Sequence, residues 1–517
     1  MRETEKLRQA VELTLDSGYQ LAKGAFEFLI LFSETGDPAD IVGKAIKKIE
    51  SSNQKSFFIE RSLLEELVEN SQIKEEFYSP PEDPVQKEAV PRRTEGKRRF
   101  DPYAEGVEAN LEVIRDPSNE SSSSGAIEDY VKYFRDRFKR MERLLRQRID
   151  VRNAISVKDA LRAPANTSLK ILVMITGKRE SRNRILLTVE DLDTIATVLV
   201  PQNAPPKLLK EAQSLLPDQV VCLEVRKVRG TLLIAEDVIL PDLAKRSQHM
   251  APIPIYAVLT SDLHVGSTKF QKDAFSRFVL WLNGKYGNDK MREIAGHVKY
   301  VLIAGDIVDG IGVYPNQIEE LTIKDVFEQY RFAGKLMEQI PDYIEVVITP
   351  GNHDASRKAL PQPAIPNQFL EPLQESRKVC SLGNPCLLSL HGIEILLHHG
   401  RSLEDVLSTV PKMEHGHPER AMTLLLRSRH LAPIYGGKTP LFPEPKDLLV
   451  IEEVPDIYHS GHIHKLEHTK YRGVLVVNSG CWQEQTDYMR RHGFIPTPGQ
   501  VPVVNLQTMN LTTIRFS

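Results

Sequence analysis

Short polar motifs rich in aspartate, histidine and asparagine recur in the second half of the 517-residue chain. Each motif directly follows an apolar run with the composition of a β-strand. Because functional groups commonly gather where the strands of a sheet end, we expect these side chains to meet at one sheet edge. In chain order the motifs are Asp262-Leu263-His264, Gly305-Asp306, Gly351-Asn352-His353-Asp354, His398-His399-Gly400 and Gly461-His462-Ile463-His464.

The residue types in these motifs favour a centre that binds two divalent metal ions. Carboxylates and imidazoles with one neutral amide suit manganese, which we expect, with iron, zinc or magnesium as alternatives. No cysteine belongs to the set, which argues against a purely structural zinc site. A single aspartate can bridge two cations, and two cations about 3.5–4 Å apart can hold both oxygens of an in-line displacement. The motifs therefore predict hydrolysis of phosphate esters.

The composition of the chain argues against several other classes of protein. Four cysteines without a C-x-x-C pair favour a reducing compartment over a disulfide scaffold. The N-terminus is charged and lacks an apolar signal segment, and the apolar run 26–32 is too short to span a membrane. The formal charge of -3 gives no global attraction for polyanions, so any contact with nucleic acid must be local. We expect a cytoplasmic protein that contacts no membrane.

The first part of the chain divides by composition. Residues 1–75 carry apolar residues at helical spacing and are expected to form a small helical domain, for interaction or simply for packing. Residues 76–126 are rich in proline, serine and charge, which predicts a flexible linker. Basic residues in this segment could contact a DNA backbone or simply be solvated; they are Arg92, Arg93, Lys97, Arg98 and Arg99.

Residues 127–164 are expected to form an amphipathic helix followed by a connector. Apolar residues recur along one face of the segment 127–149, with arginine and lysine opposite, so we expect this stripe to pack on the next domain. The stripe consists of Ile127, Val131, Phe134, Phe138, Met141, Leu145 and Ile149.

Residues 165–245 change to β-strand character. Five β-rich runs and one short helix, Lys207–Leu215, predict a small all-β barrel, for which an OB-fold is the first candidate. Such barrels bind single-stranded nucleic acid or protein. Because no row of exposed aromatic residues for base stacking is evident, contact with protein is favoured. The runs are Lys170–Thr176, Ile185–Val189, Ala196–Val200, Val220–Val228 and Leu232–Val238.

The ordered set of motifs between Asp262 and His464 resembles the calcineurin-like metallophosphoesterase superfamily. The resemblance implies that residues 246–517 form an α/β domain of two packed sheets flanked by helices, with a dinuclear metal centre at the strand ends. It also implies that Asp306 bridges the two cations and that His353 lies outside the ligands, near the leaving group. One cation would be bound by Asp262, His264 and His464, and the other by Asn352, His399 and His462.

The whole chain resembles the small-subunit family of the archaeal family D DNA polymerases. The similarity is most specific in residues 399–406 and 361–366, and it reaches the N-terminal region only in the order of the domains. It implies a 3′–5′ proofreading exonuclease that acts on single-stranded 3′ ends of DNA, associates with the nucleoid and pairs with a large polymerase subunit. Eukaryotic B-subunits share the architecture but have lost metal ligands, whereas every ligand position is filled here.

The adjacent histidines of the fourth motif require a choice between two candidate ligands. Side chains of neighbouring residues in an extended segment point to opposite faces, so only one of them can face the metals. We expect His399 to be the ligand, because Gly400 suits a tight turn directly after it. The family resemblance also runs through His399, and His398 is then expected to pack or to support a ligand.

Further residues are expected to act on the substrate. His353, held by Asp354, is expected to donate a proton or a hydrogen bond to the departing 3′-oxygen. Arg401 could contact a substrate phosphate in a bidentate manner, or it could form a salt bridge within the fold.

Two other functions remain compatible with the sequence. Phosphoprotein phosphatases of this superfamily typically carry G-D-x-V-D-R-G and G-N-H-E, whereas this chain lacks arginine after Asp309 and ends the second motif in Asp354. A non-catalytic scaffold subunit would not need an intact ligand set. The barrel and the helix over 127–149 nevertheless indicate that scaffolding is part of the role.

Overall fold

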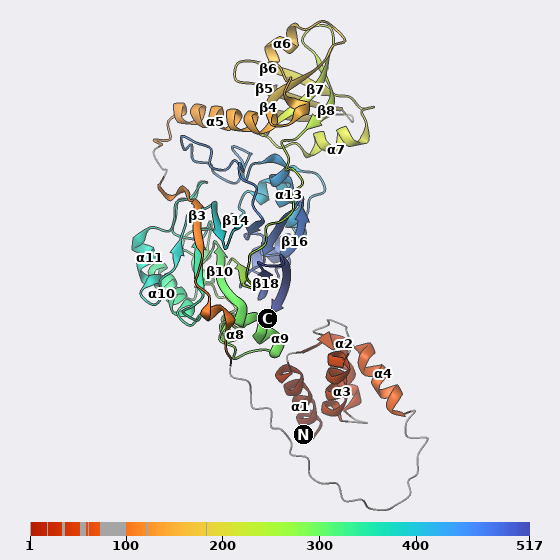
Figure 1. The fold of residues 1–517 in the computed structure, drawn as a ribbon, viewed down its shortest axis with the longest axis vertical. Coiled ribbons are helices and arrows are strands. Elements are labelled where there is room, and N and C mark those ends of the chain that lie inside the picture. Colours follow the sequence, from red (N-terminus) through yellow and green to blue (C-terminus); the bar gives the residue numbers. More distant parts are fainter. Residues whose placement is uncertain are drawn as a thin grey trace, which may run out of the picture. The chain divides into compact units, whose positions relative to one another are not determined.

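The computed structural model describes residues 2–17, 19–33, 37–51, 58–59, 61–72, 100–119, 123–181 and 184–517. They form two compact units (Figure 1), one of Met1–Gly106 with Arg277–His297 and the other of Val107–Ser276 with Val298–Ser517. Among the described helices, none is both long and apolar enough to cross a membrane. The basic residues expected to contact DNA at 92–99 lie outside the described residues.

The N-terminal part of the chain is mainly helical, as the apolar spacing predicts. Its helices bury a core that includes Leu29, Val42 and Ala45. Two very short strands pair in parallel, which the helical spacing did not predict. The elements are α1 (Arg2–Asp16), β1 (Gln20–Leu21), α2 (Lys23–Phe32), α3 (Pro38–Ser51), β2 (Phe58–Ile59) and α4 (Arg61–Gln72).

The expectation of a flexible linker over 76–126 is wrong for part of its second half. Strand β3 (Leu111–Arg115) pairs antiparallel with β13 (Cys386–Leu390) at the edge of a large sheet. Directly after β3, a carboxylate oxygen of Asp116 accepts a hydrogen bond from the backbone N–H of Gly383, at 2.9 Å. The side chains of β3 are mostly exposed, so its composition resembles a loop, and it is a strand because a distant edge supplies its partner.

The predicted barrel is present as a closed sheet with the strand order β4-β5-β6-β8-β7. All five predicted runs are strands, and the predicted helix lies between the third and the fourth. Burial alternates along β5, where Ile185, Leu187 and Val189 face the barrel interior, which is the pattern of a half-buried strand. The elements are β4 (Ser168–Ser181), β5 (Arg184–Glu190), β6 (Ile195–Val200), α7 (Pro206–Ser214), β7 (Val220–Lys227) and β8 (Leu233–Ile239).

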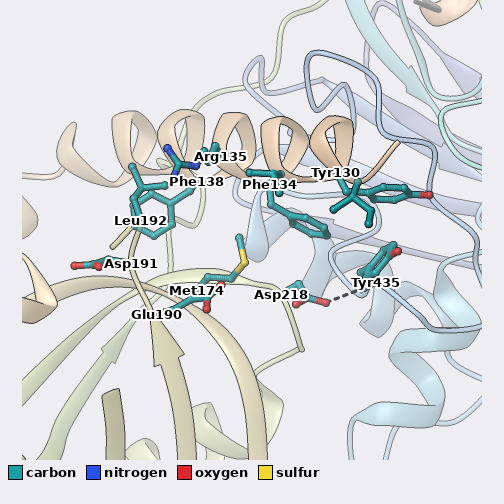
Figure 2. A pocket seen from close by; sticks show the side chains of 12 residues that line it. Tyr130, Phe134, Arg135, Phe138, Met174, Glu190, Asp191, Leu192, Asp218 and Tyr435 are labelled. Carbon is teal, nitrogen blue, oxygen red and sulfur yellow. Dashed lines mark hydrogen bonds between the residues drawn. The ribbon is translucent and has the colours of Figure 1, made fainter. Parts of the chain in front are cut away.

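Helix α5 (Ile127–Arg146) packs on the barrel with only part of the predicted apolar stripe. Phe138 and Leu145 are buried in a core that includes residues of β4 and β7. At the other end of the helix, Ile127 and Val131 are exposed and line a groove of about 390 Å³ beside the barrel (Figure 2). The short helix α6 (Val157–Arg162) follows before the barrel begins.

The basic side of α5, opposite the apolar stripe, is partly buried, because Arg137 is only 1% exposed. Its Nε lies 2.6 Å from Oδ2 of Asp447, and its Nη1 donates to the carbonyl oxygen of Pro433 at 2.6 Å. The Tyr133 hydroxyl donates to Oδ1 of Asp447 at 2.9 Å, and His430 Nε2 lies 2.8 Å from Oδ2. Burial alone would lower the pKa of Arg137, but the paired Asp447 raises it, so the ion pair persists.

Two six-stranded sheets form the remainder of the second unit, as the motif resemblance implies. The first has the order β12-β11-β10-β9-β18-β19 and the second β16-β17-β15-β14-β13-β3. The strands of the first are β9 (Tyr256–Thr260), β10 (Val298–Ala304), β11 (Glu345–Thr349), β12 (Cys380–Ser381), β18 (Gln500–Asn505) and β19 (Asn510–Arg515). Those of the second, besides β3 and β13, are β14 (Ile393–Leu397), β15 (Ile457–Ser460), β16 (Leu466–Tyr471) and β17 (Val474–Ser479).

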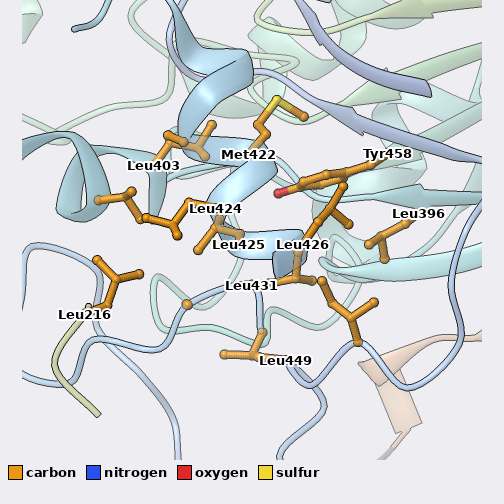
Figure 3. Close-up of a cluster of buried hydrophobic side chains, with 14 of the residues drawn as sticks. Leu216, Leu396, Leu403, Met422, Leu424, Leu425, Leu426, Leu431, Leu449 and Tyr458 are labelled. Atoms are coloured by element: carbon orange, nitrogen blue, oxygen red, sulfur yellow. The ribbon is translucent and has the colours of Figure 1, made fainter. Parts of the chain in front are cut away.

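Both faces of the second sheet are buried, so its central strands are mostly apolar, with polar residues mainly at their ends. Ile395 and Val477 face the first sheet, whereas Leu396 and Val476 pack with helices α12 and α13 in a separate core (Figure 3). Leu216, which follows α7, enters the same core and joins the barrel to this domain. The helices of the second unit are α10 (Val326–Met337), α11 (Asn367–Gln374), α12 (Leu403–Thr409), α13 (Pro418–Ser428) and α14 (Asp487–His492). Helix α9 (Asp289–His297) and the second half of α8 (Lys272–Leu282) belong to the first unit.

The buried ion pair of α5 gives a test of how firmly the barrel is held. Replacement of Arg137 by Ala leaves Asp447 buried without its cation, which is expected to lower the free energy of unfolding by about 3–5 kcal/mol. Arg143→Ala on the same helix is the control, because Arg143 is exposed and its ion pair with Glu452 is long, at 3.7 Å. The control should cost less than about 1 kcal/mol in urea unfolding. Equal costs for the two variants would contradict the role of the pair.

Candidate metal centre

The predicted motifs lie at the carboxyl ends of parallel strands. In the first sheet β9, β10 and β11 run parallel, and in the second β14 and β15 do so. Asp262, Asp306 and Asn352 follow the first three strands, whereas His399 and His462 follow the other two. The structure therefore brings the predicted side chains to one end of the paired sheets.

The backbone at this edge is strained at five predicted ligands. Left-handed conformations cost about 1–2 kcal/mol for a residue with a side chain, and they persist only where the surrounding structure imposes them. Such strain clusters at functional sites. The φ angles are 53° for Asp262, 52° for His264, 51° for Asp306, 68° for His462 and 58° for His464.

One group of ligand atoms is formed by Asp262, His264 and His464, all within 4.8 Å of one another. The two imidazole Nε2 atoms are 3.0 Å apart, and His464 Nε2 lies 3.4 Å from Oδ1 of Asp262. That oxygen is buried and accepts no hydrogen bond from any described residue. His264 Nδ1 lies 2.8 Å from Oδ1 of Asp309, which fixes the proton on Nδ1 and leaves Nε2 as a lone pair.

A second group is formed by Asp306, His399 and His462. His399 Nε2 lies 3.3 Å from Oδ2 of Asp306, 2.9 Å from Oδ1 of Asn352 and 3.3 Å from Nδ1 of His462. Its Nδ1 lies 2.9 Å from the carbonyl oxygen of Ala304, so Nδ1 carries the hydrogen of the neutral ring. The same Oδ2 of Asp306 lies 3.8 Å from Nε2 of His264, which puts Asp306 between the two groups.

The electrostatic environment at this end of the sheets favours the binding of cations. Burial alone would raise the pKa of Asp306, but nearby imidazoles hold it well below its usual range. Burial alone would lower the pKa of His399, but the carboxylates of Asp306 and Asp262 raise it to about 9. Lone pairs of buried rings and carboxylates thus converge on the same space, and only protons or metal ions can make their proximity favourable. The donor set suits two divalent ions.

His398 and His399 lie in different surroundings, as the alternation of extended residues predicts. His398 is buried, and its Nδ1 lies 3.1 Å from the hydroxyl of Tyr458, away from both groups of ligand atoms. Gly400 has a φ of 107°, and a β-carbon there would collide with the Ser460 hydroxyl. The tight turn expected after His399 therefore requires glycine.

His353 lies beside both ligand groups, and one of its ring nitrogens forms a third such group with His264 and Asp306, within the same 4.8 Å. Its ring centroid is 4.6 Å from that of His264, and its backbone N–H donates to Oδ1 of Asp306 at 2.7 Å. His353 Nδ1 lies 2.8 Å from the carbonyl oxygen of Asp309, so Nδ1 donates and Nε2 remains for a substrate. Burial lowers the pKa of His353 to about 4, which makes the ring neutral at pH 7.

The expectation that Asp354 holds His353 is wrong. The carboxylate of Asp354 accepts hydrogen bonds from the backbone N–H groups of Gly351 at 2.8 Å and Ile307 at 3.2 Å. The Tyr330 hydroxyl also donates to it, at 3.2 Å. Asp354 therefore fixes the two loops that carry Asp306 and His353 rather than the His353 ring. Adjacency in sequence suggested a contact that the turn between the residues prevents.

Arg401 lies beside the centre without a described carboxylate partner. Its Nη1 donates weakly to the carbonyl oxygen of Lys358, at 3.4 Å. Lys358, which the motifs did not point to, donates from Nζ to the carbonyl oxygens of Asn352 at 2.7 Å and Asp354 at 2.9 Å. The two cationic side chains thus flank the loop that carries the candidate ligand Asn352.

Two supporting carboxylates escaped prediction from the motifs. Asp309 orients His264 and also accepts a hydrogen bond from Gln317 Nε2 at 2.8 Å. Glu404, on α12, lies 3.2 Å from His462 Nε2, so it orients that ring in the same way. Asp309 lies three residues after Asp306 in the second motif, so the sequence could have indicated it as a supporting carboxylate. Glu404 lies within the segment 399–406 that resembles the family, but nothing in that segment indicated its role, because only the fold brings α12 to His462.

Comparison with known proteins agrees with this architecture. Residues 257–469 match the sequence family of the DNA polymerase alpha/epsilon B subunit. The DNA polymerase II small subunit of Pyrococcus furiosus is 38% identical over 390 residues, which cover 75% of this chain and 63% of that protein. The DNA polymerase II small subunit of Methanothermobacter thermautotrophicus is 37% identical over 479 residues, which cover 92% of this chain and 94% of that protein.

Solved structures resemble this chain more remotely. An archaeal phosphodiesterase is 14% identical and covers 50% of this chain, with a TM-score of 0.25. The Vps29 protein of Entamoeba histolytica with zinc is 14% identical and covers 51%, with a TM-score of 0.23. At these scores the function must be argued from the geometry of the site itself. The curated relatives, by contrast, confirm the resemblance found in the sequence, and the chain belongs to the DNA polymerase II small subunit family.

Proposed function

We propose that the chain is the 3′–5′ exonuclease subunit of a replicative archaeal DNA polymerase, acting on single-stranded 3′ ends of DNA. The observation that carries this proposal is the convergence of buried ligand atoms from five strand ends, with a complete donor set for two cations. A scaffold subunit would have no need to keep Nε2 lone pairs of His264 and His399 directed at carboxylates.

In this proposal the ligands divide between two metal ions. Two divalent ions, for which manganese remains our first choice, would supply Lewis-acid stabilisation of charge on the phosphoryl oxygens. The position of Asp306 between the two groups supports its role as the bridging carboxylate. One ion would be held by Asp262, His264 and His464, and the other by Asn352, His399 and His462.

His353 would act at the leaving group through Nε2. With Nδ1 donating to the Asp309 carbonyl, a proton on Nε2 makes the ring a cation. The pKa of about 4 in the free protein is too low for this at pH 7. An approaching phosphodiester anion raises the pKa of such a ring, so substrate binding itself would prepare His353 to protonate the departing 3′-oxygen.

The cationic side chains beside the centre would orient the DNA backbone. Arg401 makes only a weak hydrogen bond within the fold, so its guanidinium can turn to a phosphate at small cost. Lys358 is tied to the backbone of the metal-binding loop and would contribute a fixed positive charge there. Together they favour a polyanion over a neutral substrate.

The remainder of the chain would serve assembly. We propose that the closed five-stranded barrel is an OB-fold and that it contributes, with α5, to contact with a large polymerase subunit. Its firm attachment through Arg137 and Leu216 supports a barrel that acts as one body with the phosphoesterase domain. Scaffolding of this kind is compatible with catalysis in the same chain.

The first experiment compares digestion of 5′-labelled single-stranded DNA by the wild-type chain and by Asp306→Ala with manganese. A 3′–5′ exonuclease shortens the labelled strand stepwise, whereas the opposite polarity releases a labelled mononucleotide at once. The variant should be folded, inactive and depleted in bound metal, because it lacks the bridging carboxylate. Asp342→Ala is the control, because that carboxylate is fully exposed at 105%. Normal digestion by Asp306→Ala at saturating manganese, or preferential hydrolysis of a phosphoserine peptide, would refute the proposal.

A second prediction separates a proton donor from a ligand. His353→Ala should lower kcat on single-stranded DNA by about 100- to 10,000-fold, the usual contribution of a general acid or base. Elemental analysis should still find both metals in this variant. Loss of a metal together with the side chain would make His353 a ligand instead.

A third prediction concerns the neighbouring histidines. His399→Ala should lose one metal and the hydrolysis of DNA, because its Nε2 faces Asp306 and Asn352. His398→Ala should keep both metals and instead lower the thermal stability, because it removes a buried ring that contacts the Tyr458 hydroxyl. The assignment must be exchanged if metal analysis gives the reverse pattern.

A further inference from the structure

Four aromatic rings form a continuous stack near the metal centre, outside the motifs discussed so far. The ring centroids of His415 and Phe494 are 4.0 Å apart, and those of Phe494 and His492 are 5.7 Å apart. The His492 ring in turn lies 4.2 Å from that of Tyr488. We call these four residues, His415, Phe494, His492 and Tyr488, the aromatic ledge.

The ledge is open to solvent at its Tyr488 end. Tyr488 is 57% exposed and His492 is also exposed, whereas Phe494 and His415 are partly buried. Monomeric cores do not usually leave several adjacent aromatic rings accessible, and exposed patches of this kind commonly mark binding surfaces. The exposed surface of the ledge consists of planar ring faces rather than aliphatic side chains.

The backbone holds the ledge in place. Phe494 N–H donates to the Met489 carbonyl oxygen at 2.8 Å, and Gln485 Nε2 donates to the Phe494 carbonyl oxygen at 2.7 Å. Gly493, between His492 and Phe494, has a φ of 72° and ends α14. The rings are therefore presented by a defined turn.

Both ends of the segment that carries the ledge are attached to the metal centre. Trp482 N–H donates to the carbonyl oxygen of Asp262 at 2.9 Å, and Thr497 N–H donates to that of His464 at 2.8 Å. Phe494 is three residues from Thr497, a separation of at most about 11 Å along an extended chain. The ledge therefore begins only a few residues from the backbone contact with His464.

The carboxylate of Glu404 acts on both the aromatic ledge and the metal centre. Burial lowers the pKa of His415, and the carboxylate of Glu404 opposes that effect. The same carboxylate lies 3.2 Å from His462 Nε2. In addition, α14 carries the exposed residues Arg490 and Arg491. Arg490 forms an ion pair with Asp487 at 2.9 Å, but the pair is exposed, so a phosphate can compete for the guanidinium at small cost. Aromatic faces next to cationic side chains are the combination that binds single-stranded nucleic acid.

We propose that the aromatic ledge stacks the bases of single-stranded DNA next to the phosphodiester that is cleaved. The inference rests on the proposed function and specifies how the substrate is held. The ring stack receives bases at Tyr488 and His492, and Arg490 and Arg491 contact the neighbouring phosphates. Because every base has a π-face, the ledge holds the strand without preference for sequence. It also disfavours a paired 3′ end, since bases within a duplex are not free to stack on protein.

The test compares two 5′-labelled oligothymidylates, one with all its bases and one with abasic residues at the last two 3′ positions. The wild-type chain should prefer the complete strand by about 5- to 150-fold in kcat/KM, as stacking of one base gives. Tyr488→Ala should remove most of this preference, and Tyr488→Phe should restore it, because only the ring is needed. Hydrolysis of bis(p-nitrophenyl) phosphate should stay unchanged in all variants, since this small diester does not reach the ledge.

A matched control is Tyr435→Ala. Tyr435 is 47% exposed, but its ring packs on Phe134 of α5 at a centroid distance of 5.4 Å. This variant should keep the wild-type preference for the complete strand. A Tyr488→Ala chain that still discriminates between the two strands would overturn the proposal. If that variant instead lost capture of the large polymerase subunit, the ledge would be a protein contact.

Binding measured in EDTA separates the two proposals. Fluorescence anisotropy with the same strands requires no turnover, so it reports stacking even if the chain hydrolyses no DNA. Weaker binding of the complete strand by Tyr488→Ala, with unchanged binding of the abasic strand, would support the ledge alone. Absence of hydrolysis in the wild-type chain would refute only the proposed exonuclease. Equal binding of both strands by the wild-type chain would overturn the ledge itself.

Discussion

The fold must hold electron-rich atoms close together at the end of two sheets, and the rest of the structure depends on this constraint. His399 Nε2 lies within 3.3 Å of an aspartate oxygen, an amide oxygen and another imidazole nitrogen. In the absence of positive charge these contacts are repulsive, so the protein must enforce them. Parallel strands fix the starting point of each motif, and strained left-handed backbone turns the side chains inward. The free energy needed for this comes from the apolar cores on either side of the second sheet.

Hydrogen bonds behind the candidate ligands define which nitrogen atom of each imidazole is available. Asp309, the Ala304 carbonyl and Glu404 each contact the far nitrogen of one imidazole. They select the tautomer before any cation arrives, and thereby reduce the entropy that binding must overcome. Asp354 lies further from the ligand atoms, and its carboxylate fixes the loops that carry Asp306 and His353 rather than an imidazole ring.

The sequence was informative where chemistry and periodicity coincide. Polar motifs after apolar strands located Asp262, Asp306 and His399 correctly at one edge, and alternation separated His398 from the ligands. It was uninformative where a residue depends on a partner far along the chain. β3 has too few buried side chains to be recognised without β13, and no local pattern indicated that Arg137 would be buried, because its partner Asp447 lies 310 residues away. Glu404 and the aromatic ledge escaped for the same reason, since neither contains a local motif.

The position of β3 has a mechanical consequence. β3 precedes the barrel in sequence but belongs to the second six-stranded sheet, and the chain returns to the two-sheet domain in β9 after the barrel. The barrel is thus an insertion, fastened on the outgoing side where Asp116 meets Gly383 and on the returning side where Arg246 meets Asp456 at 2.8 Å. A body anchored at two points cannot swivel about a single hinge. Any load applied to the barrel is shared between an edge strand and a loop that leads into β15, the strand that His462 follows.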